Sequence, residues 1–380
     1  MPYWRLSSYY FFYFASLGAL VPFWGLYLQS KGFDALAIGL LMAILSATKI
    51  VAPMLWGHLA DHGGRRMRLV QLGSLLAFLG FLVVFAASGF WGMALAMLLF
   101  SFFWNASLPQ MEAITFNHLR ERPTGYALVR VWGSIGFVLV VVALGVFVER
   151  GSLGIVPVWV LALVLGILIS TLLIPDSPPA SGDRASPSLR ALLCCPEVIA
   201  FFAACFLMQL SHGIYYAFYS IHLESAGYSS TAVGQLWALG VVAEVAVFLV
   251  MHRLLDRFGA RRVLIWSLGL AAVRWFAIGA CVDLLAVQIG AQLLHAASFG
   301  TFHAAAIHLV HHLFPGRTQG RGQALYNSLS FGAGGAAGSL VGGLLWSDYG
   351  PVLTFGVGSA VSALGLVIAV RWMRESFAHD

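Results

Sequence analysis

Long apolar runs separated by short polar segments fill the chain from end to end. Each run holds about 20 residues, enough for a helix to cross a hydrocarbon layer of roughly 30 Å. The pattern predicts twelve membrane-spanning helices, at 7–29, 36–57, 68–88, 91–117, 125–148, 155–174, 198–223, 232–251, 262–281, 285–310, 323–346 and 351–371. The first run is too long for a signal-peptide core and lacks a convincing small-residue cleavage site, so we expect it to be retained.

Composition supports a membrane protein. Hydrophobic residues make up 60% of the chain and charged residues only 9%, against about 45–50% and about 25% in soluble domains. A water-soluble fold has too little polar surface to cover that much apolar side chain. The fold class predicted is therefore all-α and integral to the membrane.

The basic residues indicate the topology. The formal charge of +6 is compatible with nucleic-acid binding, but 16 of the 21 Lys and Arg fall in loops or at helix ends on one side of the predicted bundle. Only Lys31 and Arg150 fall on the other side. By the positive-inside rule, both termini and the central loop are cytoplasmic, and the partner of this surface is the lipid bilayer rather than nucleic acid.

One polar segment divides the chain. The run PDSPPASGDRASPS lies within residues 175–197 and has the Pro- and Ser-rich composition of a flexible linker. It separates two predicted six-helix bundles, at 1–174 and 198–380.

The two halves are related in sequence. YLQSKGFDALAIGLL at 27–41 aligns with HLESAGYSSTAVGQL at 222–236 at a constant offset, which pairs Gly32 with Gly227 and Gly39 with Gly234. The same offset pairs Asp61 with Asp256. Two pseudo-symmetric halves of this kind are typical of secondary transporters, whose substrate site lies near the bilayer midplane.

A charged signature follows the second predicted helix of each half. The first copy is GHLADHGGRR at 57–66 and the second is DRFGARR at 256–262. These segments resemble the signature cytoplasmic loop of the major facilitator superfamily, and the resemblance extends over the whole chain through the helix count, the central loop and the repeat. It implies a conformational gate, to which we assign Gly57, Asp61, Gly64, Arg65, Arg66, Asp256 and Arg261. We expect short loops, with the arginines binding acidic or carbonyl groups on the adjacent bundle.

Five charged residues lie inside predicted helices and away from their ends, where charge is costly and usually functional. They are Lys49, Glu112, Arg130, Glu244 and Arg274. Glu112, Arg130, Glu244 and Arg274, with His295, resemble the pattern of the lactose permease group, which includes the 3-phenylpropionate and nucleoside proton symporters. The resemblance implies substrate binding by the first-half pair, and substrate binding with proton coupling by the second-half residues. The chain departs from lactose permease at Gln292 and Ser298, where that protein has Lys and Glu.

We therefore expect Glu244 to carry the coupling proton, with Arg274 as the switch and His295 as the relay. An arginine that approaches or leaves a carboxylate changes its proton affinity. Glu112 is expected to pair with Arg130 or Lys49. Static salt bridges that fix helix packing remain the alternative for both pairs.

Three cations against two carboxylates favour an anionic substrate. Lys49 or Arg130 is expected to hold its carboxylate. Asn105, seven residues before Glu112 on the same helical face, is expected to add a polar group. Tyr215 and Tyr216 are the aromatic candidates for stacking on the substrate, although aromatic residues near membrane interfaces are more often belt anchors.

Two further motifs are set aside. His303, His308, His311 and His312 include spacings that suit a metal on a helix face, but no Cys or carboxylate completes a site, so no metal site is expected. Gly334 and Gly338, in a glycine-rich run, have the spacing of close helix packing rather than of a phosphate loop. No cofactor and no catalytic constellation are expected, so the chain is not predicted to be an enzyme.

The function predicted is secondary transport by alternating access in a bacterial inner membrane, by a monomer whose partners are protons and a small-molecule substrate. Symport of an aromatic or other organic acid is favoured, with a nucleoside or sugar next. Proton-driven efflux is the alternative within transport, and a transport-inactive receptor or a membrane enzyme is a remote alternative.

Overall fold

The computed structural model describes residues 2–63, 65–119, 125–176, 193–316 and 318–373, and within these ranges the regular structure is entirely helical. This agrees with the predicted fold class. A backbone surrounded by hydrocarbon must bond its own N–H and C=O groups, and uninterrupted apolar helices do so within one segment.

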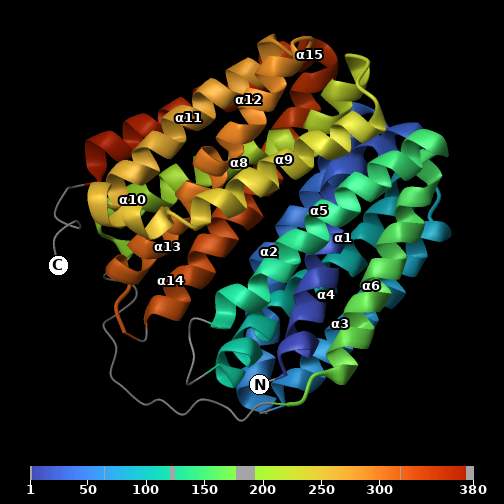
Figure 1. Cartoon of the computed structure of the whole chain (residues 1–380), viewed down its shortest axis with the longest axis vertical. Coiled ribbons are helices and arrows are strands. Elements are labelled where there is room, and N and C mark those ends of the chain that lie inside the picture. The colour runs from blue at the N-terminus through green and yellow to red at the C-terminus, as the bar shows by residue number, and fades with distance from the viewer. Residues whose placement is uncertain (1, 64, 120–124, 177–192, 317, 374–380) are drawn as a thin grey trace. The chain divides into compact units, whose positions relative to one another are not determined.

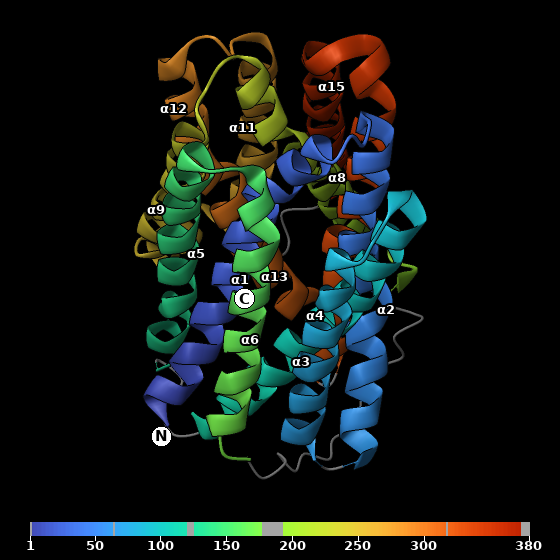
Figure 2. The ribbon, with the colours of Figure 1, turned by 90° about the vertical axis from the view of Figure 1, so that its right-hand side faces the viewer.

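The first compact unit comprises residues 1–182 together with 228–238. Its helices are α1 (Tyr3–Ser30), α2 (Ala35–Gly63), α3 (Arg66–Leu82), α4 (Gly89–His118), α5 (Gly125–Arg150) and α6 (Val156–Leu173), with short 3-10 turns at Val83–Phe85 and Leu153–Ile155. α1 packs against α5 and α6, and α4 packs against α2 and α3. Figure 2 shows these helices running alongside one another.

The second compact unit comprises residues 183–227 and 239–380. Its helices are α8 (Pro196–Ser225), most of α9 (Ser230–Phe248), α10 (Met251–Phe258), α11 (Ala260–Ala280), α12 (Leu285–His295), α13 (Phe302–Leu313), α14 (Thr318–Tyr326) and α15 (Gly335–Trp372). π-helical stretches join α12 to α13 at Ala296–Thr301 and α14 to α15 at Asn327–Gly334. α15 packs along α8 and α11 (Figure 1).

Eleven segments of the described chain are long and apolar enough to span a membrane. The last of them, Thr318–Trp372, is a double span, because Gly350 has φ 76° and breaks the helical path before Pro351. This break separates the two last helices that the sequence predicts. The described chain therefore accommodates the twelve predicted spans.

The repeat is visible in the turns that join the first two spans of each half. Gly32 has φ 84° and its counterpart Gly227 has φ 86°, values that favour glycine. The next helix is capped in both copies. The Ala37 N–H donates to Asp34 Oδ1 at 2.8 Å, and the Ala232 N–H donates to Ser229 Oγ at 3.3 Å.

The start of α9 belongs to the first unit because it packs closely on α5. A Cβ atom on Gly145 would lie 2.6 Å from the Ser230 carbonyl oxygen, and one on Gly234 would lie 2.5 Å from that of Val141. Glu149 Oε2 accepts a hydrogen bond from the Thr231 N–H at 3.0 Å. A carboxylate at a helix N-terminus is electrostatically favourable.

The second copy of the signature segment differs from the short loop that we expected. Residues 251–258 form helix α10, which carries Asp256, and only Gly259, with φ 77°, makes the turn into α11. In the first copy α2 continues to Gly63. The signature residues therefore lie mostly on helix ends rather than in loops.

Candidate functional site

A carboxylate and a histidine meet in the second unit. Glu244, on α9, places Oε2 3.6 Å from Nε2 of His295, the last residue of α12. The Glu244 side chain is 18% exposed and that of His295 is 8% exposed. Both groups can bind a proton, and their separation allows a direct electrostatic interaction.

Arg274, on α11, is fully buried and is held by neutral oxygens. Its Nε donates to the Ala291 carbonyl at 2.8 Å, Nη1 donates to Ser298 Oγ at 3.1 Å, and Nη2 donates to Gln292 Oε1 at 3.4 Å. Gln292 and Ser298 are the two positions at which the sequence departs from lactose permease. Both residues that differ from lactose permease therefore bind Arg274.

Aromatic rings complete the surroundings of Arg274. Its guanidinium lies 4.4 Å from the centre of the Tyr215 ring and 4.5 Å from that of Trp275. The Tyr215 hydroxyl donates to Gln292 Oε1 at 3.0 Å. Tyr215 therefore contributes to the network that holds Arg274, while the half-buried Tyr216 lies beside it with ring centres 5.6 Å apart.

This region also contains buried polar groups, among them His212 and Trp275, that the sequence analysis did not single out. His212, on α8, is fully buried; its Nδ1 lies 2.9 Å from the Met208 carbonyl oxygen, and its ring centre lies 6.4 Å from that of His295. His212 Nε2, Trp275 Nε1 and Gln292 Nε2 have no hydrogen-bond partner among the described residues. Buried polar groups are normally hydrogen-bonded, so this cluster is suited to hold a polar ligand or water.

The carboxylate of the first unit is joined to tyrosine rather than directly to arginine. The Tyr126 hydroxyl, on α5, donates to Glu112 Oε1, on α4, at 3.2 Å. Arg130 interacts with the same hydroxyl, and its guanidinium lies 3.6 Å from the centre of the Phe14 ring. The expected Glu112 and Arg130 pair is thus linked through Tyr126, a residue that the sequence did not single out.

Lys49, on α2, is half-buried and forms no hydrogen bond or ion pair with any residue that the structure describes. The segment that carries it is fixed by Asn105, on α4, whose amide nitrogen donates to the Leu45 carbonyl and to Thr48 Oγ1, both at 2.9 Å. Asn105 is therefore placed to position Lys49, since its amide donors are already bonded to α2.

The candidate gate residues are placed at helix ends. Gly57 faces Gln110 of α4, Arg65 is exposed before α3 and Arg66 begins that helix. Gly64 and the side chain of Asp61 lie outside the described residues. Asp256 is exposed on α10.

Arg261 binds carbonyls of its own unit. Its Nη2 donates to Val370 at 3.1 Å and its Nε donates to Met373, both at the end of α15. Basic side chains at a helix C-terminus satisfy the last carbonyls and complement the helix dipole. These carbonyl contacts lie within one unit, between α11 and α15, whereas the contact that we expected was with the adjacent bundle.

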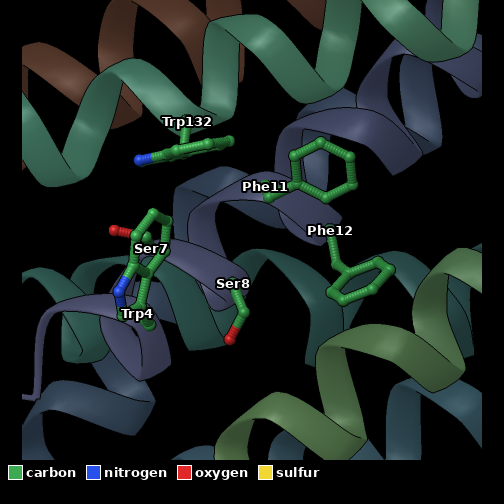
Figure 3. A pocket seen from close by; sticks show the side chains of 6 residues that line it. All are labelled: Trp4, Ser7, Ser8, Phe11, Phe12 and Trp132. Atoms are coloured by element: carbon green, nitrogen blue, oxygen red, sulfur yellow. The ribbon is translucent and has the colours of Figure 1, made fainter.

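A separate hollow of about 200 Å³ lies beside α1 in the first unit. Figure 3 shows its lining, with Trp132 of α5 facing Trp4, Ser7, Ser8, Phe11 and Phe12 of α1. None of the candidate charged residues lines it. Trp4 is 69% exposed, and exposed tryptophan at the end of a span is typical of an anchor at the membrane surface.

Comparison with known proteins identifies the family. The model of the MFS_1 like family matches residues 3–357. The chain is 31% identical to the probable 3-phenylpropionic acid transporter of Escherichia coli over 90% of each chain. It is 27% identical to the maltose permease of Geobacillus stearothermophilus over 97% of this chain and 94% of that one.

A solved structure has the same fold. The nucleoside transporter NupG, in the form of a point mutant, superposes with a TM-score of 0.84 at 18% identity over 97% of this chain and 98% of that chain. The family match, the relatives and this fold agree with the membrane-spanning architecture. The chain therefore belongs to the MFS_1 like family of secondary transporters.

Proposed function

We propose that this transporter couples the uptake of a small organic acid to protons. The observation that carries the proposal is the contact of Glu244 with His295, two protonatable side chains 3.6 Å apart among membrane-spanning helices. Ionisable groups at such positions are typical of proton relays. Arg274 supplies a fixed positive charge nearby, and its neutral hydrogen-bond partners leave Glu244 as the acid of this cluster.

The substrate class is proposed from the first unit. Lys49 has no partner among the described residues, and an unpaired ammonium group in a low-dielectric site favours a carboxylate. The relative with 31% identity is named a probable transporter of 3-phenylpropionic acid, an aromatic carboxylate. Aromatic acids are therefore favoured, with nucleosides and sugars next. We place this activity in a bacterial inner membrane, carried out by a monomer.

Uptake by right-side-out membrane vesicles tests the proposal. We expect labelled 3-phenylpropionate to accumulate when the outside is more acidic than the inside, and accumulation to stop when a protonophore collapses the gradient. Uridine and maltose serve as competing substrate classes. Uptake that reaches equilibrium without accumulation would contradict proton coupling, and accumulation of only uridine or maltose would contradict the acid assignment.

Efflux is the second candidate. A multi-drug resistance efflux pump PmrA homolog of Lactococcus lactis is 29% identical over 123 residues, which is 31% of this chain. Uptake is favoured because the relatives named for 3-phenylpropionic acid and maltose match at least 90% of this chain. Inside-out vesicles separate the two candidates, since an efflux protein would accumulate lipophilic compounds in them as protons leave.

A further inference from the structure

Two histidines converge at the end of α13, away from the transport clusters. His308 and His312 are one helical turn apart, and their Nε2 atoms lie 3.1 Å from each other. Both side chains are exposed. The pair belongs to the histidine string that the sequence set aside for lack of a complete ligand set.

The separation of the two nitrogens matches that of two ligands on one metal ion. Zinc binds imidazole nitrogen at about 2.0–2.1 Å in tetrahedral geometry, which places two such nitrogens about 3.3 Å apart. A hydrogen bond between neutral rings explains the same contact in the absence of metal. Metal binding requires that both rings carry their proton on Nδ1, which leaves each Nε2 lone pair available to the ion.

Two further groups that can bind metal lie within electrostatic range of His308. His308 interacts electrostatically with His311 of the same helix and with Asp256 of α10. Both neighbours are exposed, so their side chains can turn. Within the described residues no three histidine, cysteine or acidic side chains already stand in ligand positions, so water completes the coordination sphere or one of these neighbours rotates into it.

We propose that His308 and His312 form a binding site for a divalent transition-metal ion of the zinc class at the end of α13. The imidazole nitrogens supply two ligands. The site goes beyond transport and involves no residue assigned to substrate or proton binding.

Zinc titration of the full chain by calorimetry tests this site. The protein carries a tag without histidine, and Cys194 and Cys195 are replaced by Ser, because both thiols are exposed and also bind zinc. We expect one ion to bind. Loss of a group that only supports a metal ligand costs roughly 10–100-fold in metal affinity, so His308→Ala and His312→Ala should each weaken binding at least about tenfold.

Two control variants separate metal ligation from misfolding and from binding at another histidine pair. His312→Cys supplies another zinc ligand and should retain binding that His312→Ala loses, which separates ligation from misfolding. His62→Ala removes one member of the other histidine pair one turn apart, on α2, where the ring centres of His58 and His62 lie 4.2 Å apart, and should leave binding unchanged. Absence of saturable zinc binding, or binding that survives both alanine substitutions, would overturn the site.

Discussion

Lys49, Arg130 and Arg274 carry the same charge but have different partners. Arg274 is held by the Ala291 carbonyl, Gln292 and Ser298, and Arg130 lies over the Phe14 ring. Lys49 has no partner within the described part of the chain. Lys49 is therefore the cation whose hydrogen-bond donors are available for a substrate.

Lys49→Gln is expected to weaken the binding of 3-phenylpropionate by about 1.5–3 kcal/mol, the range for a hydrogen bond to a charged group. Lys49→Arg keeps the charge and should retain most of the affinity. Binding is measured by ligand-induced thermal stabilisation in detergent. Lys31→Gln removes an exposed cation between α1 and α2 and serves as the control. If Lys49→Gln binds like the parent while Arg130→Lys does not, Arg130 holds the carboxylate instead.

Glu244→Gln should abolish accumulation driven by a proton gradient and leave substrate exchange intact. Glutamine cannot take up a proton, whereas exchange needs the conformational cycle without net proton movement. Counterflow and gradient-driven uptake in the same vesicles measure the two activities. Glu224→Gln, an exposed acid at the end of α8, is the matched control. If Glu244→Gln still accumulates substrate, Glu244 does not carry the coupling proton, and His295 and Glu112 are the next residues to test.

The charged members of the site were predictable and their partners were not. Glu244 and Arg274 are conspicuous because charge is rare within apolar runs. Their partners depend on how the helices are rotated about their axes, which periodicity does not define in helices that are apolar nearly all round. His212 was missed for a related reason: a neutral histidine is unremarkable until its burial is known.

At the scale of the helix, the length of the apolar runs predicted the spans but not the breaks and π-helical stretches within them. The break at Gly350 falls between the two last predicted helices. The apolar pattern does not predict the π-helical stretches Ala296–Thr301 and Asn327–Gly334. The first follows His295 directly, and π-helical segments are frequent at functional sites.

Glycine spacing in the last helices did predict close packing. In the structure, a Cβ atom on Gly334 would lie 2.6 Å from the Phe206 carbonyl oxygen, and one on Gly338 would overlap the carbonyl of Leu210. Both contacts join this part of the chain to α8. The interpretation of the run as a packing surface is thus confirmed.

Gly338→Ala is expected to destabilise the protein by about 1–3 kcal/mol, because the added methyl group forces α15 away from α8. The unfolding temperature of purified protein measures the effect. Gly356→Ala is the control, since Gly356 lies in the span that follows the break at Gly350, with no atom within 4 Å of the added methyl. Alanine there should be neutral or stabilising by up to about 1 kcal/mol, as alanine favours helix. Equal unfolding temperatures for the two variants would contradict the packing argument.

For the whole molecule, the repeat was the strongest signal in the sequence. It is visible in the matching turns at Gly32 and Gly227. The compact units differ from the predicted halves at residues 228–238, which group with the first unit. A boundary drawn at one point of the sequence cannot predict this grouping, because the close approach of Gly145 to Ser230 joins segments far apart in the chain. The domain boundaries at 174 and 198 therefore stay predictions.

The topology of the whole chain follows from its charge and from an even number of spans, and both termini are expected in the cytoplasm. Basic residues gather at alternate helix ends, with 16 on one side and two on the other, and cations are retained on the cytoplasmic side during insertion. Alkaline phosphatase, active only in the periplasm, should therefore be silent when fused after Asp380. The same enzyme fused after Gly151, beyond α5, should be active. Its activity is the positive control for expression of the fusion proteins. Activity after Asp380 would require an odd number of spans or an inverted chain, and would contradict the twelve-helix assignment.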